Sequence, residues 1–307
     1  EGIYFLNFKP ESAKAYEKIA KAYEEETGIP VKVVTAAANT YEQTLKSEVA
    51  KNDAPTIFQV NGPIGYQSWK EYCADLTDTK LYSYLTDKNL AIKNEGEVYA
   101  IPYVVEGYGI IYNDAIMKKY FAFSDKAVNI DSAEQITNLE TLKAVVEDMS
   151  ARKDELGFSA FSSAGLDGSS SWRFSGHLAN IPLFYEFRDN GITSQPAQIS
   201  GKYLDNFKNI WDLYINNATC SKTELTTKTG DESLAEFGSG KAVFYQNGSW
   251  EFANLIDKFG MKAENLAMIP IYIGVEGEED AGLASGTENC WAVNSQASES
   301  DIQATLD

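Results

Sequence analysis

The alternation of apolar runs and helical segments over the first 60 residues is the feature that most constrains the fold. Apolar runs at residues 3–8, 31–34 and 56–60 predict three strands. Strands that alternate with helices favour parallel α/β winding, in which ligands bind beyond the carboxyl ends of the strands. The predicted fold class is therefore α/β. Between the strands, apolar residues recur at helical spacing and predict two helices whose apolar faces pack on the core. The first face consists of Tyr16, Ile19, Ala20 and Tyr23, and the second of Tyr41, Leu45 and Val49.

A long extended stretch in the middle of the chain breaks this pattern. It reads EVYAIPYVVEGYGIIYND, and its Pro102, Gly107 and Gly109 are unfavourable inside a central strand. We therefore expect two strands joined by a crossing segment at Glu106-Gly107, which passes from one lobe to another. A length of 307 residues suits two lobes better than one core. The predicted boundaries are 1–106 for lobe 1, 107–263 for lobe 2, 264–300 for a return to lobe 1, and 301–307 for the start of a C-terminal helical region that is cut short.

The segment GKAVFYQNGSWEFANL places a tryptophan at the start of a helix. Its apolar run predicts a strand, and the Asn247-Gly248 pair that follows is typical of a two-residue hairpin turn. The next residues have helical spacing instead, with Ser249 as the expected N-cap and Gly260 as the expected end. Trp250 lies about 160° from the apolar face of this helix, at about 100° per residue, so it points away from the helix's own core. That apolar face consists of Phe252, Leu255, Ile256 and Phe259.

Charge and composition exclude several classes of function. The chain carries 45 acidic against 26 basic residues, a net charge of −19, and such a surface repels nucleic acid and anionic membranes. No apolar run approaches the length of a membrane span. The sequence begins at Glu1 without an initiator Met or a signal peptide, as expected of a trimmed mature form. The three cysteines, Cys73, Cys220 and Cys290, are far apart in the sequence, and one disulfide between two of them is possible.

Short motifs do not indicate a catalytic or cofactor site. The single histidine, His177, has a helical setting without the partners of a zinc site or a Ser-His-Asp triad, which favours a structural role. The GSGK sequence at 238–241 fails as a phosphate-binding loop, because Ala occupies two of the required positions. We therefore expect no cofactor and no metal. The many Asp and Glu residues leave open a carboxylate pair for glycoside hydrolysis, although no motif proposes one.

Aromatic and polar residues at the ends of predicted elements form the remaining candidate site. Sugars present apolar C–H faces, which suit aromatic rings, and hydroxyl groups, which suit Asn, Asp, Glu and Arg side chains. This combination favours binding of a sugar. The candidate residues are Lys9, Gln59, Asn61, Glu106, Tyr108, Trp172, Arg173, Asn247, Trp250 and Glu251, with Asn289 and Trp291 as a further pair.

Four segments together carry a resemblance to a known family. They are YFLNFKPESAKAYEKIAKAYEEETGIPVKV, APTIFQVNGP, EVYAIPYVVEGYGIIYN and GKAVFYQNGSWEFANL. In this order they resemble the extracellular solute-binding proteins of bacterial carbohydrate ABC transporters, in the maltodextrin-binding-protein-like form seen in Gram-positive gut bacteria. The resemblance implies a two-lobe, type II periplasmic-binding-protein-like fold with hinge strands and a sugar in the cleft. It also implies a monomeric protein, not an enzyme, that delivers its sugar to a membrane permease and is held at the cell surface by a lipid anchor upstream of Glu1.

The resemblance also implies roles for individual residues. Trp250 matches the family tryptophan that stacks on a sugar ring, and Glu106 matches a cleft carboxylate after the crossing segment. Lys9 falls near a polar cleft position after the first strand. The family's third strand often carries an aromatic residue at the cleft, where Gln59 or Asn61 of this chain must act by hydrogen bonding instead.

Structural alternatives stay open for several of these residues. The resemblance implies that Trp172 and Arg173 lie where the second lobe contributes contacts, but Trp172 also suits an inward-packing helix start and Arg173 a salt bridge. Trp250 also suits a core position, and Glu106 an ion pair near the crossing. Trp291 is expected in the core, because it lies inside a predicted strand. The alternative functions are the same fold binding an acidic sugar or a polyamine, and a carbohydrate-active enzyme.

Overall fold

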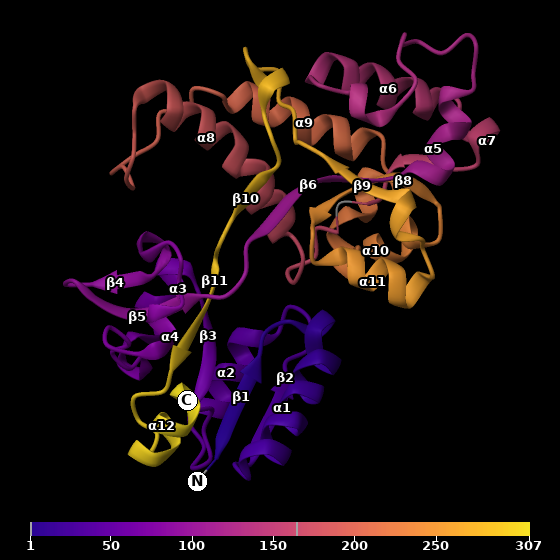
Figure 1. The fold of residues 1–307 in the computed structure, drawn as a ribbon. Coiled ribbons are helices and arrows are strands. Elements are labelled where there is room, and N and C mark those ends of the chain that lie inside the picture. The colour runs from indigo at the N-terminus through magenta and orange to yellow at the C-terminus, as the bar shows by residue number, and fades with distance from the viewer. Residues whose placement is uncertain (1, 164) are drawn as a thin grey trace. The chain divides into compact units, whose positions relative to one another are not determined.

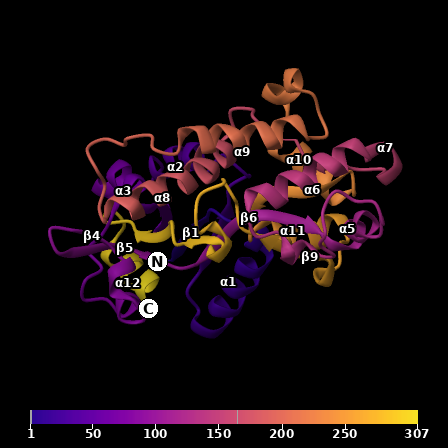
Figure 2. The same ribbon diagram turned by 90° about the horizontal axis from the view of Figure 1, so that it is seen from above.

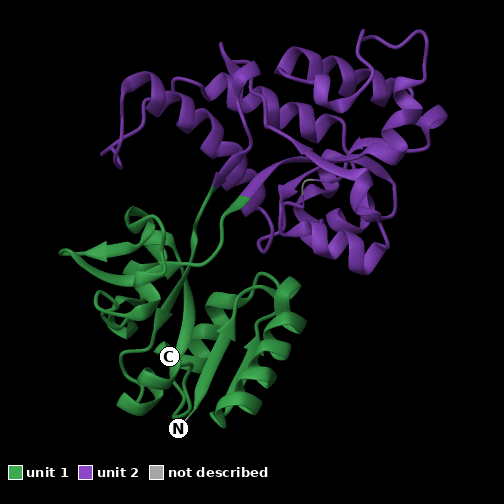
Figure 3. Cartoon of the chain, viewed as in Figure 1, with its two compact units in different colours: residues 1–106, 286–307 green, residues 107–285 purple. Residues whose placement is uncertain are grey.

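The computed structural model describes residues 2–163 and 165–307, and it divides into two compact units (Figure 3). Unit 1 comprises residues 1–106 and 286–307, and unit 2 comprises residues 107–285. The first division lies at the crossing segment that the sequence indicates. The second division differs from the predicted boundaries, because residues 264–285 belong to unit 2 rather than to lobe 1. The reason is strand pairing, since β9 (Leu266–Ile269) pairs with β6 (Glu106–Asn113) in the sheet of unit 2.

Unit 1 is built on a six-stranded sheet (Figure 1). The first three strands are parallel, as the alternation of strands and helices predicts, whereas β11 runs antiparallel to both of its neighbours. In spatial order the strands are β2 (Val31–Thr35), β1 (Ile3–Asn7), β3 (Ile57–Asn61), β11 (Asn289–Val293), β5 (Glu97–Pro102) and β4 (Ile92–Asn94). The helices are α1 (Ala13–Thr27), α2 (Tyr41–Val49), α3 (Gly62–Trp69), α4 (Lys80–Ser83) and α12 (Glu299–Leu306).

One face of this sheet is well covered. Successive strand residues point to opposite faces, so Tyr4, Leu6, Phe58 and Val60 share one face. They are all buried in one core cluster with Tyr41 and Leu45 of α2 and Tyr66 of α3. The positions of α2 predicted to face the core therefore do so at Tyr41 and Leu45.

The other face of the sheet, which α1 lines, is covered only in part. Of the predicted core positions on α1, only Ala20 is buried, and Ile19 is 61% exposed. Tyr16, Ile19 and Tyr23 line an open apolar groove of about 240 Å³ together with strand residues and with Ala304 of α12. The expected burial of this helix face was therefore wrong for Ile19, because the groove between α1 and α12 stays open.

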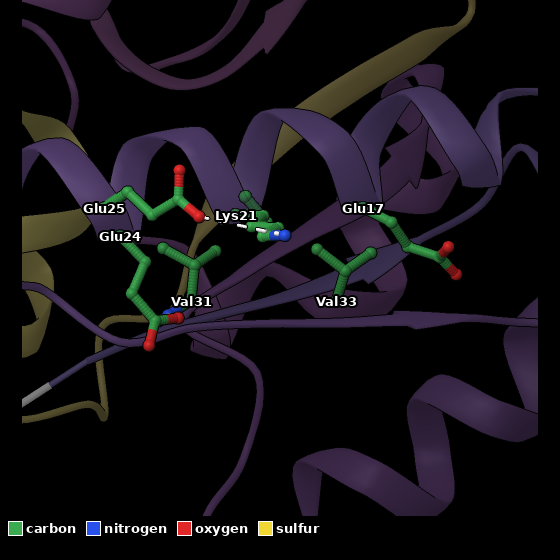
Figure 4. A pocket seen from close by; sticks show the side chains of 7 residues that line it. Glu17, Lys21, Glu24, Glu25, Val31 and Val33 are labelled. Carbon is green, nitrogen blue, oxygen red and sulfur yellow. Dashed lines mark hydrogen bonds and ion pairs between the residues drawn. The ribbon is translucent and has the colours of Figure 1, made fainter.

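A second depression lies on the outer side of α1 and carries none of the candidate residues. It is lined by charged side chains of α1 and by Val31 and Val33 of β2 (Figure 4). Lys21 and Glu25 form an ion pair of 3.8 Å there, and both side chains are exposed. Such a pair is worth little in water, so this depression is an ordinary solvated surface.

Unit 2 contains a second sheet with helices packed around it. Its strands lie in the order β10 (Ala284–Gly286), β6, β8 (Ala242–Gly248) and β7 (Ser159–Phe161), with β9 paired to β6. The helices are α5 (Asp114–Phe121), α6 (Leu139–Ala151), α7 (Lys153–Leu156), a π-helix over Arg173–Leu178, α8 (Ala179–Asn190), α9 (Leu204–Asn216), α10 (Gly230–Gly238) and α11 (Glu251–Phe259). α8 and α9 lie side by side (Figure 2). In residues 2–163 and 165–307, no helix combines the length and the apolar character that crossing a membrane requires.

The segment around Trp250 folds as a strand, a tight turn and a helix, as its spacing predicts. β8 ends at Gly248, α11 begins at Glu251, and Gly260 ends the helix in the left-handed conformation with φ 66°. The predicted capping role of Ser249 was wrong, because the N-cap position is Trp250 and no side chain caps the helix. The Ser249 hydroxyl instead accepts a hydrogen bond of 3.2 Å from the backbone N–H of Gly107.

Candidate functional site

Four ring side chains of unit 2 meet in what we call the aromatic patch, which consists of Tyr108, Trp172, His177 and Trp250. His177 lies at its centre. Its imidazole stacks on Tyr108 with ring centroids 3.9 Å apart and planes 6° apart, and it meets Trp172 edge-on at 5.1 Å. The Trp250 ring lies 5.5 Å from His177 and 6.0 Å from Trp172. The patch reaches solvent, since Trp172 is 39% exposed.

The two-stranded ladder of β6 and β8 explains why Trp250 lies in this patch. Tyr108 and Gly248 are directly opposite each other in the antiparallel pairing, so their side chains would share one sheet face. Gly248 has no side chain, and a Cβ built there would lie 2.1 Å from the indole of Trp250. The indole therefore fills the space next to Tyr108 that a side chain at position 248 would take. This placement is why the helix carries its tryptophan at the first turn and on the side away from its own core.

The patch carries polar groups as well as ring faces. Asn180 donates a hydrogen bond of 3.1 Å from its side-chain amide to the Tyr108 hydroxyl. Gln246 donates from Nε2 to Nδ1 of His177 at 2.9 Å, which places the imidazole proton on Nε2. Burial and the nearby charge of Arg173 lower the pKa of His177 to about 3, so the ring is neutral.

Three predicted ligand contacts of unit 2 are buried and bonded to protein groups. Arg173 is 2% exposed, places its guanidinium 5.3 Å from the centroid of the Tyr245 ring, and donates to the carbonyl of Gln246 at 3.3 Å. Asn247 donates to the Tyr245 hydroxyl at 2.7 Å, and that hydroxyl donates to the Glu251 carboxylate at 3.3 Å. These partners favour a supporting role for all three residues, in which they fix the end of β8 and the start of α11.

Polar residues of unit 1 form a second group, which we call the polar group and which consists of Lys9, Glu11, Glu106 and Asn289. The ammonium of Lys9 lies 2.8 Å from Oε2 of Glu106 and 3.5 Å from Oε1 of Glu11. Oε1 of Glu106 accepts a hydrogen bond from the Asn289 amide. Burial raises the pKa of Glu11, while the charge of Lys9 opposes that rise. Sequence analysis did not single out Glu11, which follows Lys9 and Pro10 directly after the first strand.

A further set of side chains extends along β3 and β11 of unit 1. Gln59 is buried and donates to the side chain of Asn61 at 2.5 Å, and it accepts from the Tyr103 hydroxyl at 2.5 Å. The Tyr103 ring stacks on Trp291, with centroids 4.5 Å apart and planes 11° apart. Trp291, which was expected in the core, is half-buried and lines the apolar groove beside α1. Tyr103 was missed, although it follows the last residue of β5 and so stands at a strand end.

The aromatic patch of unit 2 and the polar group of unit 1 offer different kinds of contact to a ligand. The aromatic patch provides π faces, and the polar group provides carboxylate, amide and ammonium groups that bond well to hydroxyls. Among residues 2–163 and 165–307, His, Cys, Asp and Glu side chains nowhere form a group that could hold a metal ion.

Comparison with known proteins places these observations in context. A curated relative, the melibiose/raffinose/stachyose-binding protein MelE of Bacillus subtilis (strain 168), is 35% identical over 121 residues. The aligned part covers 38% of this chain and 28% of MelE, so this chain matches less than a third of the relative's length.

Solved structures share the fold over the whole chain. A sugar transporter from Bacillus licheniformis in complex with stachyose aligns with a TM-score of 0.64 and 21% identity, covering 99% of this chain and 76% of that one. A chitin oligosaccharide binding protein aligns with a TM-score of 0.71 and 18% identity, covering 100% of this chain and 75% of that one. The expected α/β fold of the type II periplasmic binding proteins is therefore confirmed.

The sequence itself decides the family. The family model described as bacterial extracellular solute-binding protein matches residues 18–307, which is nearly the whole chain. The resemblance drawn from four segments of the sequence is thereby confirmed at the level of the extracellular solute-binding proteins. The protein belongs to the bacterial extracellular solute-binding proteins.

Proposed function

We propose that the protein is the substrate-binding component of an ABC importer and that its ligand is a neutral sugar or oligosaccharide. The aromatic patch carries the proposal, because three aromatic rings and a neutral imidazole meet at a partly exposed surface of unit 2. Such rings stack on the C–H face of a pyranose, and Tyr108 and Asn180 add hydrogen-bonding groups beside them. The polar group of unit 1 is proposed to contact sugar hydroxyls.

The charges support a neutral ligand over an acidic one. Carboxylate recognition calls for an arginine that can reach the ligand, but Arg173 is 2% exposed and bonded inside unit 2. In the polar group, two carboxylates accompany the single ammonium of Lys9. A polyamine would need free carboxylates, yet Lys9 and Asn289 already bond to the two oxygens of Glu106. A neutral sugar needs neither an exposed arginine nor a free carboxylate.

The remaining parts of the proposal concern where and with what the protein works. We propose that it is a monomer that delivers its sugar to a membrane permease, that it works outside the cell, and that it is held at the cell surface by a lipid anchor. We propose that it does not transform the sugar. The family description supports a place of work outside the cell, and the sugars named for the relatives support a sugar as the solute.

Calorimetry with a sugar panel tests the binding function. The panel contains melibiose, raffinose, stachyose and chitin oligosaccharides, because these sugars appear in the names of the relatives or in their complexes. A maltodextrin, a uronic acid and a polyamine complete the panel. Saturable binding of a neutral sugar, with the uronic acid and the polyamine inert, is the expected result. Tight binding of either charged compound alone would contradict the neutral-ligand proposal.

Chromatography of the same mixtures tests the proposal that the protein is not an enzyme. After long incubation the sugar should be recovered unchanged, in an amount equal to the input. Steady release of a smaller sugar would show glycoside hydrolysis, which needs two carboxylates on either side of the bond. Loss of that activity in Glu106→Ala would then identify Glu106 as one of the two carboxylates.

A further inference from the structure

A buried histidine at the centre of the aromatic patch is the feature that the proposed function does not yet explain. His177 contacts all three of the other rings of the patch. The imidazole is 8% exposed, so little of it is available to a ligand. Its position suggests that it acts through its neighbours.

The backbone around His177 is unusual and is tied to the sheet. Residues 173–178 form a π-helix, a rare conformation that often occurs at functional sites. Two bonds join it to one residue of β8: Arg173 donates to the Gln246 carbonyl, and the Gln246 amide donates to His177. Gln246 pairs with Ile110, and Gly248 pairs with Tyr108, so Gln246 and Tyr108 lie on the same face of the sheet.

These contacts form a connected chain of fixed groups. The strand β8 fixes Gln246, Gln246 fixes the plane of the imidazole, and the imidazole covers one face of the Tyr108 ring at 3.9 Å. The edge of the same imidazole meets Trp172, and its ring lies beside Trp250. Side chains that are held before a ligand arrives lose less conformational entropy on binding, and this raises affinity.

We propose that His177, fixed by Gln246, is a positioning residue that holds Tyr108, Trp172 and Trp250 in the arrangement that receives a sugar ring. This inference rests on the proposed function, because the ligand of the patch is a sugar. The ring must be neutral for this role, since Nδ1 has to accept the hydrogen bond from Gln246. The charge of Arg173, in the same π-helix, opposes protonation of His177.

The test uses three variants of the full chain and two readouts. His177→Ala removes the ring, His177→Phe keeps a flat ring that can stack on Tyr108, and Phe174→Leu is the matched control. Phe174 lies in the same π-helix and is 3% exposed, and its ring contacts Trp211 and Tyr214 in the core. The readouts are the near-ultraviolet circular dichroism of the tryptophans without sugar, and the Kd for the sugar that binds best in the panel.

The expected result separates positioning from a general loss of stability. His177→Ala should weaken the tryptophan dichroism and raise Kd about tenfold. The reason is that two or three side chains, no longer held in place, must lose conformational entropy when the sugar binds. His177→Phe, which keeps a ring that can stack on Tyr108 but cannot accept the bond from Gln246, should restore part of both values. Phe174→Leu should lower the melting temperature and change only the contribution of Trp211 to the dichroism, while leaving Kd near that of the wild type. Equal effects of His177→Ala and Phe174→Leu on both readouts, or no recovery with His177→Phe, would overturn the proposal.

Two further arms keep the result decisive. If His177→Ala does not fold, Gln246→Leu replaces it, because this variant keeps the imidazole but removes the hydrogen bond that fixes it. Gln246→Leu should also weaken the dichroism and raise Kd. Unchanged values of both would overturn the proposal. If the wild type binds no sugar of the panel, the proposed function fails, and the dichroism series alone decides whether His177 orders the rings.

Discussion

The indole of Trp250 occupies the volume that a side chain on Gly248 would need. A Cβ at Gly248 would lie 2.1 Å from two atoms of the indole, and a real contact is never that short. Gly248 has no positive φ, so the backbone itself would accept another residue. The glycine is therefore required by the ring and not by the conformation of the chain.

Gly248→Ala should displace the indole and weaken sugar binding. The added methyl group forces Trp250 to leave its place beside Tyr108, and the loss should approach that of removing the ring, about 1–2 kcal/mol of binding free energy. Calorimetry on four proteins checks the cause: wild type, Gly248→Ala, Trp250→Ala and the double variant. Because the methyl acts through the ring, Gly248→Ala should cost almost no affinity in the Trp250→Ala background. Additive losses would show that the methyl disturbs something else.

Trp250→Ala should reduce sugar affinity while the fold persists. Loss of one aromatic platform is worth about 1–3 kcal/mol at comparable binding hot spots. Trp250 lies at the N-cap of α11 and makes no side-chain cap bond, so the helix does not depend on it. Trp69→Ala is the matched control, since Trp69 lies on α3 of unit 1 and belongs to neither candidate group. A variant with normal Kd and a much lower melting temperature would identify Trp250 as a core residue.

Lys9→Met should destabilise unit 1, and the loss should shrink as the pH falls. Removing the ammonium leaves Glu106 and Glu11 partly buried without their cation, a change that costs about 2–3 kcal/mol of unfolding free energy near pH 7. Burial already raises the pKa of Glu11 above its ordinary value. A carboxyl with a raised pKa binds its proton more readily in the folded state, so acid restores stability as the pH falls through that pKa.

Urea unfolding at a series of pH values measures this effect. Lys21→Met is the matched control, because Lys21 pairs with Glu25 at 3.8 Å on the exposed surface of α1. That variant should unfold like the wild type at every pH. A Lys9→Met protein whose deficit is constant with pH would mean that Glu11 and Glu106 reach solvent freely once Lys9 is gone.

Local patterns in the sequence predict most of the elements near the site. The period of apolar residues identifies the strands and helices of residues 3–60, and helical spacing after Gly248 rules out a hairpin. These features depend only on residues close together in the chain. Burial depends on what lies across from an element, which is why Ile19 was expected in the core but is exposed.

Relations between distant segments are the part that the sequence does not predict. β9 was assigned to the wrong unit because its partner, β6, lies more than 150 residues earlier. The aromatic patch joins β6, the π-helix and the turn before α11, so the position of His177 between Tyr108 and Trp250 has no local signal. The sequence also does not show whether an arginine such as Arg173 is buried or exposed, because in both cases it is a polar residue at a helix start.

The neutral state of His177 should make folding stability depend on pH in a specific way. The pKa of His177 is about 3 in the folded protein against 6.5 ordinarily, so the unfolded chain takes up the proton first as the pH falls. Its contribution to stability is therefore complete above about pH 6.5 and is lost progressively below it. Between about pH 7.5 and about pH 5, the wild type should lose about 2 kcal/mol more unfolding free energy than His177→Phe, at about 1.4 kcal/mol per pH unit. Other titrating groups cancel in this comparison, and equal losses in the two proteins would show that His177 becomes protonated without unfolding.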